Sequence, residues 1–463
     1  MPPSDYIHTR TLSEQPSNTN YTSPYFSKVV DAHPYFPNLS AAASDETSVK
    51  KVAFVLIYSS LLLRYGVTDE AEHVSMLTEM LNNDNDQSSS TTILNQLSCT
   101  KVTGGITNAL FRISGFQSLS LPSSTVATTT SITTDYDSVL VRLFGAEGMI
   151  NRDIETSTYA ALCDAGIAYR YMGRFQNGRI EGWLDGYHPL QNDDLSHEEI
   201  SLEIAKEMAR LHCLFQLPQG ELRDHHCGTE LDKITVGLWD QLSSWMEQAR
   251  GYTDFKTEED TERVGLLQLD KIEMEVTDII QSFTSQDDAV ASDGDKNNSS
   301  TASICFCHND LLPANIMQNK ATGHIQLIDF EYGGSNYAAF DMANHFNEYA
   351  GGTTEEENGV PDYTRFPDVE RQTKFCVEYV KMMKRLESEV SDVTEDEDED
   401  VIMDEARQLL SHVQKFILVN HLYWGLWAVN QAAEEGCEEF DYLTYASNRF
   451  NEYYIKKAEL EEK

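Results

Sequence analysis

Along the chain, the spacing of apolar residues changes near residue 190. From 97 to 185, apolar and polar residues alternate in short runs bounded by turn residues, which predicts a small, mostly antiparallel β unit. A single helical pattern interrupts this unit at 151–165. Asn177 and Gly178 lie between two strand-like runs and predict a hairpin, because both residues tolerate a positive φ angle.

Beyond residue 190, apolar residues recur every three or four positions, as they do on one face of a helix. Ser196 and Glu199 have the spacing of a capping box in front of the first such pattern, and Ile204 and Met208 would lie on its buried face. Further helical patterns lie near residues 231–249, 263–284, 369–389, 404–435 and 440–460. The sequence therefore predicts an α+β fold, with a β-rich N-terminal lobe and a larger, mainly helical C-terminal lobe.

Three regions follow from these patterns: an N-terminal extension with a helix over 1–92, a β-rich lobe over 93–190, and a helical lobe over 191–463. The helix of the extension, near 48–81, contains an apolar run that is too short to span a bilayer and is interpreted as a core helix. Stretches rich in Ser, Thr or acidic residues are expected to form exposed loops. They lie at 117–135, 286–303, 353–360 and 391–403.

The formal net charge of the 463 residues is -42, and part of it is concentrated in acidic runs at 355–357 and 394–400. A field of this sign repels nucleic acid and anionic membranes and favours a cationic ligand, so no nucleic-acid partner is expected. The N-terminal residues have no basic start followed by an apolar segment, so neither a secretory signal nor a transmembrane segment is predicted.

The eight cysteines are scattered, without the paired spacing of a metal site. Cys305 and Cys307 would lie on the same side of a predicted strand, and we interpret them as buried, reduced residues rather than as a zinc site. Reduced cysteines indicate a reducing compartment, so a cytoplasmic location is expected.

One short β segment in the helical half contains most of the candidate chemistry. Strand-like runs at 315–318 and 324–329 flank a turn, and a hairpin there would bring Asp310, Asn315 and Asp329 close together. Oxygen-bearing side chains of this kind are the ligands that Mg²⁺ prefers.

The spacing in this segment is also typical of kinases. Asp310 and Asn315 have the spacing of a kinase catalytic loop, and Asp329-Phe330-Glu331 occupies the place of the metal-binding Asp-Phe-Gly. In that mechanism the first aspartate accepts the proton of the substrate hydroxyl, while the asparagine and the second aspartate hold metal ions on the phosphates of ATP.

A candidate phosphate-binding element lies upstream in the β unit. Gly104 and Gly105, followed by Ile106, Thr107 and Asn108, lie between two predicted strands, where backbone N–H groups can approach a phosphate. A tight hairpin without a ligand explains the same residues equally well.

Arg142, on the strand that follows, would pair with phosphate oxygens or would be a surface residue of an edge strand. Glu155, on the next helix, could pair with it.

Four segments resemble the choline/ethanolamine kinase family: GGITNALFR (104–112), CHNDLLPANI, the run at 328–351, and YWGLWAVNQA (423–432). The resemblance implies the two-lobed fold of protein kinases and aminoglycoside phosphotransferases, with the nucleotide bound by the β-rich lobe. It implies ATP and Mg²⁺ as cofactors and a small amino alcohol as substrate, whose phosphorylation begins phospholipid head-group synthesis. Since family members are often dimeric, a homodimer is also among the expectations.

By this resemblance, Asp310 is the catalytic base, and Asn315 and Asp329 are the metal ligands, with Glu331 as an accessory ligand. Residues 104–108 and Arg142 would hold the nucleotide phosphates. The implied substrate pocket consists of Glu348, Trp424, Trp427, Tyr445 and Tyr332. Trp424 and Trp427 are three residues apart and so share a helix face, where an ammonium group would be attracted to the rings. The pattern alone favours both as core residues of this helix, and the resemblance favours the substrate pocket instead.

The branch within the family is predicted from three details: Leu311-Leu312 after Asp310, the sequence NHFNEYAG around Glu348, and INRDIE at 150–155. They favour ethanolamine as substrate. A choline kinase or a dual kinase is the nearest alternative, an aminoglycoside kinase a further one, and an inactive kinase-like scaffold the most remote, because Asp310, Asn315 and Asp329 are all present.

Overall fold

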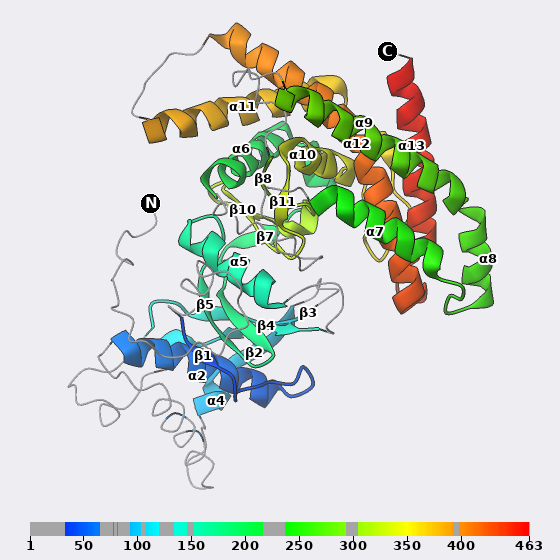
Figure 1. Cartoon of the computed structure of the whole chain (residues 1–463). Coiled ribbons are helices and arrows are strands. Elements are labelled where there is room, and N and C mark those ends of the chain that lie inside the picture. Colours follow the sequence, from blue (N-terminus) through cyan, green and yellow to red (C-terminus); the bar gives the residue numbers. More distant parts are fainter. Residues whose placement is uncertain are drawn as a thin grey trace.

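The computed structural model has two lobes, each with its own hydrophobic core, which confirms the predicted α+β architecture (Figure 1). The β-rich lobe contains the N-terminal part of the chain, and the larger lobe is mainly helical. Among the described helices, none combines the length and the apolar composition needed to cross a bilayer. The structure describes residues 33–64, 77, 81, 93–102, 108–119, 134–145, 152–215, 237–292, 304–391 and 398–462.

The first lobe is built on a six-stranded sheet in which β1 pairs with β5 in parallel and all other neighbours are antiparallel. Side by side, the strands are β1 (Tyr35–Phe36), β5 (Tyr171–Phe175), β6 (Gly178–Gly182), β4 (Ser138–Phe144), β3 (Asn108–Ser114) and β2 (Ser98–Val102). The strands predicted after residue 97 are thus confirmed. So is the helix predicted at 151–165, which is α5 (Arg152–Asp164).

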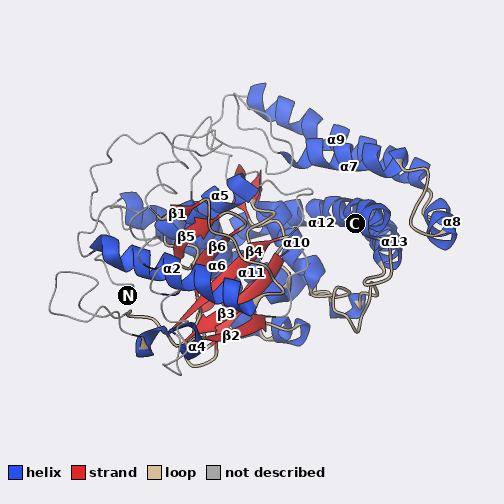
Figure 2. Cartoon of the chain, turned by 90° about the horizontal axis from the view of Figure 1, so that it is seen from below, coloured by secondary structure: helices blue, strands red, loops and turns tan. Residues whose placement is uncertain are grey.

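Helix α2 (Glu46–Arg64) packs on this sheet and belongs to the same core, together with the short helix α4 (Ile93–Gln96) (Figures 1 and 2). Its residues from Ala53 to Tyr58 are fully buried, as expected for the apolar run that was interpreted as a core helix. The described part of region 1–92 therefore packs with the β-rich lobe. The boundaries of the three regions themselves stay a prediction.

The hairpin predicted at Asn177 and Gly178 joins β5 to β6, with Phe175 opposite Gly178. The physical reason differs from the expected one, since neither residue has a positive φ angle. Asn177 instead exchanges two hydrogen bonds with the backbone of Ala41, and a Cβ atom at Gly178 would lie 2.3 Å from the Arg142 carbonyl oxygen. Close packing, rather than turn geometry, requires glycine there.

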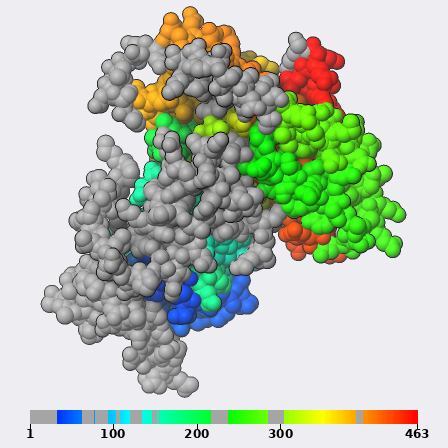
Figure 3. Space-filling view, in the orientation of Figure 1, coloured from blue at the N-terminus to red at the C-terminus, as the bar shows by residue number. Residues whose placement is uncertain are grey.

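The second lobe surrounds the fully buried helix α10 (Ala338–Glu348), against which α12 (Glu399–Glu435) packs. Helix α11 (Val369–Ser391) packs against both α6 (Glu198–Leu214) and α12, and α13 (Tyr442–Glu461) packs against α12. Figure 3 shows the remaining helices, in green, on one face of the molecule: α7 (Gly237–Gly251), α8 (Glu258–Leu266) and α9 (Leu269–Ser292).

The predicted capping box of α6 is wrong. The helix begins at Glu198 after His197, whose side chain makes no capping hydrogen bond. The Ser196 hydroxyl instead donates to the Asp193 carbonyl oxygen, because the residues from Asn192 to Ser196 form a 3₁₀ turn that has its own capping box.

Two small sheets lie at the junction of the lobes. In one, β9 (Ile316–Asn319) pairs with β10 (Ile325–Leu327) and with β7 (Tyr187–Pro189). In the other, β8 (Ile304–Cys307) pairs with β11 (Gly334–Tyr337). These short strands position the segment in which the sequence predicted the catalytic chemistry.

Candidate active site

The hairpin of β9 and β10 brings together the residues that the sequence predicted to converge. Leu327 lies opposite Ile316, and the Ile328 amide donates to the Asn315 carbonyl oxygen at 3.0 Å. Asn315 and Asp329 therefore lie at the same end of the hairpin. Asp329 has a φ angle of 62°, a conformation that is rare outside glycine and that occurs more often at functional sites.

Asp310 lies beside Asn315 in this small volume. The Asn315 side-chain amide donates to the carbonyl oxygen of Asp310 at 2.9 Å and to its carboxylate at 3.0 Å. Burial, together with the negative charges of Glu348, Glu331 and Asp329, raises the pKa of Asp310 well above its usual value, while the Asn315 hydrogen bond acts in the opposite direction. An excess of negative charge of this kind favours the binding of cations.

Glu331 and Asn108 connect the two lobes. The Asn108 side-chain amide donates to the Glu331 carboxylate at 3.4 Å, and the Arg152 guanidinium lies 3.7 Å from the same oxygen. Asn108 is buried at the start of β3. The other predicted phosphate-binding residues of this segment, Gly104, Gly105, Ile106 and Thr107, lie outside the described residues.

Arg142 is buried on β4, which lies inside the sheet, so the interpretation as a surface arginine on an edge strand is wrong. Its guanidinium donates to Glu181 at 2.8 Å and to Asp329 at 3.3 Å. The arginine therefore reaches from the β-rich lobe to the end of the β9–β10 hairpin.

Glu155 forms ion pairs with Arg152, at 2.9 Å, and with Arg179, at 2.8 Å, and the charge of Arg142 also acts on it. Burial raises its pKa, but Arg179, Arg142 and Arg152 lower the pKa to about 2. Sequence reasoning missed Arg179 and Glu181. Their spacing of two on a strand, which places both on one face, is the signal that could have found them.

Helix α10 holds the loop that contains Asp310, the predicted catalytic loop, through Asp341. Its two carboxylate oxygens accept the backbone N–H groups of His308, at 2.8 Å, and of Asn309, at 2.7 Å. His212 on α6 lies 3.0 Å from the same carboxylate. A buried carboxylate that accepts two backbone amides fixes the conformation of the loop just before Asp310.

The next turns of α10 hold the other side of the loop. Asn344 accepts the Leu311 amide at 2.6 Å, and His345 Nδ1 lies 3.3 Å from the Leu311 carbonyl oxygen. Together with Asp341, these residues hold the backbone on both sides of Asp310. None of the three was predicted. A partner of a backbone group has no signature of its own in the sequence.

Glu348 ends the same helix and is buried. Arg449 lies 3.5 Å from its carboxylate and donates to the Tyr445 hydroxyl at 3.1 Å. Burial raises the pKa of Glu348, and Arg449 counteracts this shift. The predicted residues Glu348 and Tyr445 are thus brought together by Arg449, which the sequence analysis missed.

The predicted aromatic residues form one continuous cluster beside these carboxylates. Tyr332 contacts Trp424 with ring centroids 5.4 Å apart, and Trp424 contacts Trp427 at 5.3 Å, so the two tryptophans share a face of α12 as predicted. The cluster continues through Tyr442 and Phe440. Phe440 contacts Tyr445 at 6.0 Å.

A pocket opens beside Asn309 and Tyr332, between the catalytic loop and α7. Leu238, Gln241 and Tyr423 also line it. Of the predicted substrate-binding residues, Tyr332 alone is among those that line it.

The family described as choline/ethanolamine kinase matches residues 99–454. A probable choline kinase of Arabidopsis thaliana is 31% identical over 70% of this chain and 79% of its own length. An ethanolamine kinase of Mus musculus is also 31% identical, over 70% of this chain and 78% of its own length.

Solved structures show the same fold at lower identity. An ethanolamine kinase of Plasmodium vivax has a TM-score of 0.59 at 22% identity and covers 87% of this chain and 96% of its own. A choline kinase of Cryptosporidium parvum has a TM-score of 0.59 at 23% identity and covers 79% of this chain and 90% of its own. The two-lobed fold predicted from the sequence is therefore confirmed by comparison as well as by the architecture.

Proposed function

Because the chain belongs to the choline/ethanolamine kinase family, we propose that it transfers the γ-phosphoryl group of ATP to the hydroxyl of ethanolamine, giving phosphoethanolamine and ADP. The observation that supports this most is the convergence of Asp310 with Asn315 and Asp329, next to Glu348. This reaction would be the first step of phosphatidylethanolamine head-group synthesis. The proposed enzyme is expected in the cytoplasm. It is also expected to form a homodimer, which light scattering would test.

In this proposal Asp310 accepts the proton of the substrate hydroxyl as the oxygen attacks phosphorus. The amide of Asn315 fixes the Asp310 carboxylate, at 3.0 Å. The backbone of the loop is held by α10, so the carboxylate stays in place without having to reorganise during the reaction.

Mg²⁺ would be held by Asn315, Asp329 and Glu331, whose oxygen atoms are the ligand type that this ion prefers. The pKa of Asp310, which burial and then the negative charges of Glu348, Glu331 and Asp329 raise, is consistent with this assignment, because a cation bound beside these carboxylates would offset their charge. When bound, the ion supplies positive charge to the phosphate oxygens. Arg142, Asn108 and residues 104–107 are the proposed contacts of the phosphates of ATP.

Glu348 is the proposed counter-charge for the substrate ammonium, with Tyr332, Trp424, Trp427 and Tyr445 around it. The ethanolamine ammonium offers three N–H donors and gains most from carboxylate and hydroxyl oxygens, such as those of Glu348 and Tyr445. Choline offers methyl groups and gains most from aromatic faces. The buried carboxylate therefore favours ethanolamine.

Choline kinase, or a kinase that accepts both alcohols, is the second candidate. The aromatic cluster around Trp424 supports it, since such a surface suits a quaternary ammonium group. Named relatives of both kinds match the chain to similar extents.

The experiment that decides between them is a steady-state comparison of ADP release from MgATP with ethanolamine, with choline and with no acceptor. We expect the larger kcat/KM for ethanolamine. A larger value for choline would retain the mechanism and assign specificity to the aromatic cluster. No acceptor-dependent ADP release with either alcohol would refute the proposed function.

A further inference from the structure

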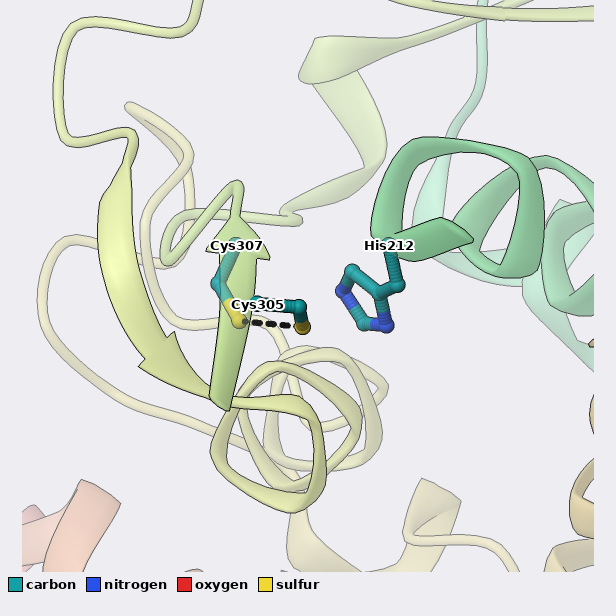
Figure 4. A group of neighbouring side chains, drawn as sticks. All are labelled: His212, Cys305 and Cys307. Carbon is teal, nitrogen blue, oxygen red and sulfur yellow. Dashed lines mark hydrogen bonds between the residues drawn. The ribbon is translucent and has the colours of Figure 1, made fainter. Parts of the chain in front are cut away.

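His212, Cys305 and Cys307 form a cluster directly behind the catalytic loop (Figure 4). Both cysteines lie on β8 and His212 lies near the end of α6, with its ring turned toward the two sulfur atoms. The two Sγ atoms are 3.6 Å apart, and one potential ligand atom from each residue lies within 4.8 Å of the others. Cys307 and His212 are buried, and Cys305 is half-buried.

The distance between the sulfur atoms suits a tetrahedral metal site. With Zn–S bonds of about 2.3 Å and tetrahedral angles, two thiolate ligands of one Zn²⁺ lie about 3.8 Å apart. The cysteines are two residues apart on a strand, so both side chains lie on one face without any change of the backbone.

Protons have to leave the cluster when a cation binds. Burial raises the pKa of Cys305, but the hydrogen bond with Cys307 and the charge of His212 bring the pKa below its ordinary value. Burial lowers the pKa of His212, but Cys305 and Asp341 raise it to about 10, so a metal ion on the ring has to displace the proton of the imidazolium. Burial and the neighbouring Cys305 raise the pKa of Cys307, so binding of a cation to both sulfur atoms has to release the proton of Cys307.

The histidine already has two partners. Its Nδ1 atom lies 2.9 Å from the Tyr379 hydroxyl, and its Nε2 atom lies 3.0 Å from Asp341. A cation on the ring therefore replaces one of these contacts. If the replaced partner is the neutral Tyr379 hydroxyl, Asp341 keeps the ring oriented, as carboxylates do for many metal-bound histidines.

From this geometry we propose that His212, Cys305 and Cys307 form a binding site for a thiophilic divalent cation of the Zn²⁺ type. The site differs in chemistry from the proposed Mg²⁺ site, because sulfur and imidazole ligands select soft or borderline metals over Mg²⁺. It also differs in place, since none of its residues belongs to the proposed Mg²⁺ set. The inference thus revises the expectation that these cysteines are only buried, reduced residues.

The test uses the full chain, freed of metal with a chelator and titrated with Co²⁺, whose bond to thiolate gives a charge-transfer absorption in the near ultraviolet. We expect this band to saturate at one equivalent and to disappear when Zn²⁺ is added. Cys305→Ala should weaken Co²⁺ binding by at least about 100-fold, because it removes a direct ligand. Cys99→Ala, at a half-buried cysteine of β2, is the matched control and should bind as the unmodified chain does.

Absence of the band, or equal Co²⁺ affinity in Cys305→Ala and the unmodified chain, would overturn the proposal. The Cys305→Ala variant is freed of thiophilic metals, Mg²⁺ and ATP are added, and kinase turnover then shows whether the variant is folded. Should that variant lose turnover, Cys307→Ala and the thermal midpoint of each variant separate loss of a ligand from loss of the fold. The outcome is independent of the substrate, so it can fail while the proposed function holds.

Discussion

The carboxyl group of Asp310 lies among three other acidic side chains, and this crowding explains much of the site's chemistry. Glu348, Glu331 and Asp329 each add to the rise in the pKa of Asp310 that burial begins. Two of them are proposed metal ligands and the third is the proposed ammonium partner. Each of the three carboxylates that raise the pKa of Asp310 is therefore expected to bind a cation. Binding of those cations would lower the pKa of Asp310 and return it to its ionised form.

Replacing Asp310 with asparagine should remove the base while keeping the shape of the side chain. We expect Asp310→Asn to lower kcat by about 10²–10⁴-fold, the usual contribution of a positioned general base, and to leave ATP affinity nearly unchanged. Asp240→Asn, at an exposed position of α7, is the control. ADP release in steady state and nucleotide binding by calorimetry measure the two effects. Turnover of Asp310→Asn within about tenfold of the control would exclude Asp310 as the base.

Glu348 and Trp424 should contribute differently to the kcat/KM values for ethanolamine and for choline. Glu348→Gln removes a charge that ethanolamine needs, so its kcat/KM should fall by about 10–100-fold, as for a lost charged hydrogen bond of about 1.5–3 kcal/mol. Trp424→Leu removes an aromatic face worth about 0.5–2 kcal/mol and should affect choline more. The ratio of kcat/KM for the two alcohols is the measurement. If both variants change the ratio in the same direction, the division of roles is wrong.

At the scale of elements, α10 combines anchoring and binding along one helix. Asp341, Asn344 and His345 hold the backbone around Asp310, and Glu348 follows one turn later. The spacings of three and four place all of them on one side of the helix. The position of the base relative to the substrate's counter-charge is therefore fixed by a single rigid element.

Asn344→Ala should loosen the loop without touching a ligand. Its side chain accepts the Leu311 amide, and leaving that buried donor unpaired costs about 1–3 kcal/mol. We expect kcat to fall while KM for ATP changes little. Asn430→Ala is the matched control, because Asn430 is an equally buried asparagine that donates to the Trp245 carbonyl oxygen. Equal kcat in the two variants would show that the Asn344 contact supports only stability.

His345 should make the protein less stable in acid. Burial lowers its pKa to about 4, below the ordinary value of 6.5, although the Leu311 carbonyl opposes the shift. Between these two values the unfolded chain binds the proton and the folded chain does not, so the free energy of unfolding falls as the pH falls through this window. The full contribution, on the order of 3 kcal/mol, is present above pH 6.5.

Urea unfolding at a series of pH values measures this contribution. His345→Asn, which can still donate to Leu311, should show a weaker loss of stability on the acid side. His324→Asn, at an exposed histidine of the β9–β10 hairpin, should behave as the unmodified chain does. An unchanged pH dependence in His345→Asn would contradict the assignment.

At the scale of the whole molecule, the patterns of apolar residues predicted the two lobes, and local motifs predicted the hairpin of Asn315 and Asp329. Both depend on residues close in sequence. The ion pair of Arg142 with Asp329, the ion pair of Arg179 with Glu155 and the anchors on α10 join residues far apart, so no local pattern indicates these contacts. The same is true of Arg449 and Glu348, which lie on different helices. Their contact depends on how those helices pack, and the sequence spacing does not predict it.

The net charge of -42 is the property that belongs to no single element. Much of it lies on the surface, where like charges repel in the compact state and salt screens them. Buried pairs, such as Arg179 with Glu155, are screened far less. We therefore expect the free energy of unfolding to rise with the concentration of potassium chloride. Potassium chloride is preferred to a sulfate salt, because sulfate is excluded from the protein surface and stabilises proteins by that route as well.

Neutralising Glu395, Asp396 and Glu397, to Gln, Asn and Gln, should make this salt effect smaller, because it removes charge from the densest acidic run. Urea midpoints at low and high potassium chloride, for both chains, measure it. If salt instead destabilised both chains equally, the attractive ion pairs would outweigh the surface repulsion, and the acidic runs would have to be explained by something other than their effect on stability. The comparison therefore tests whether the excess of negative charge lowers the free energy of unfolding.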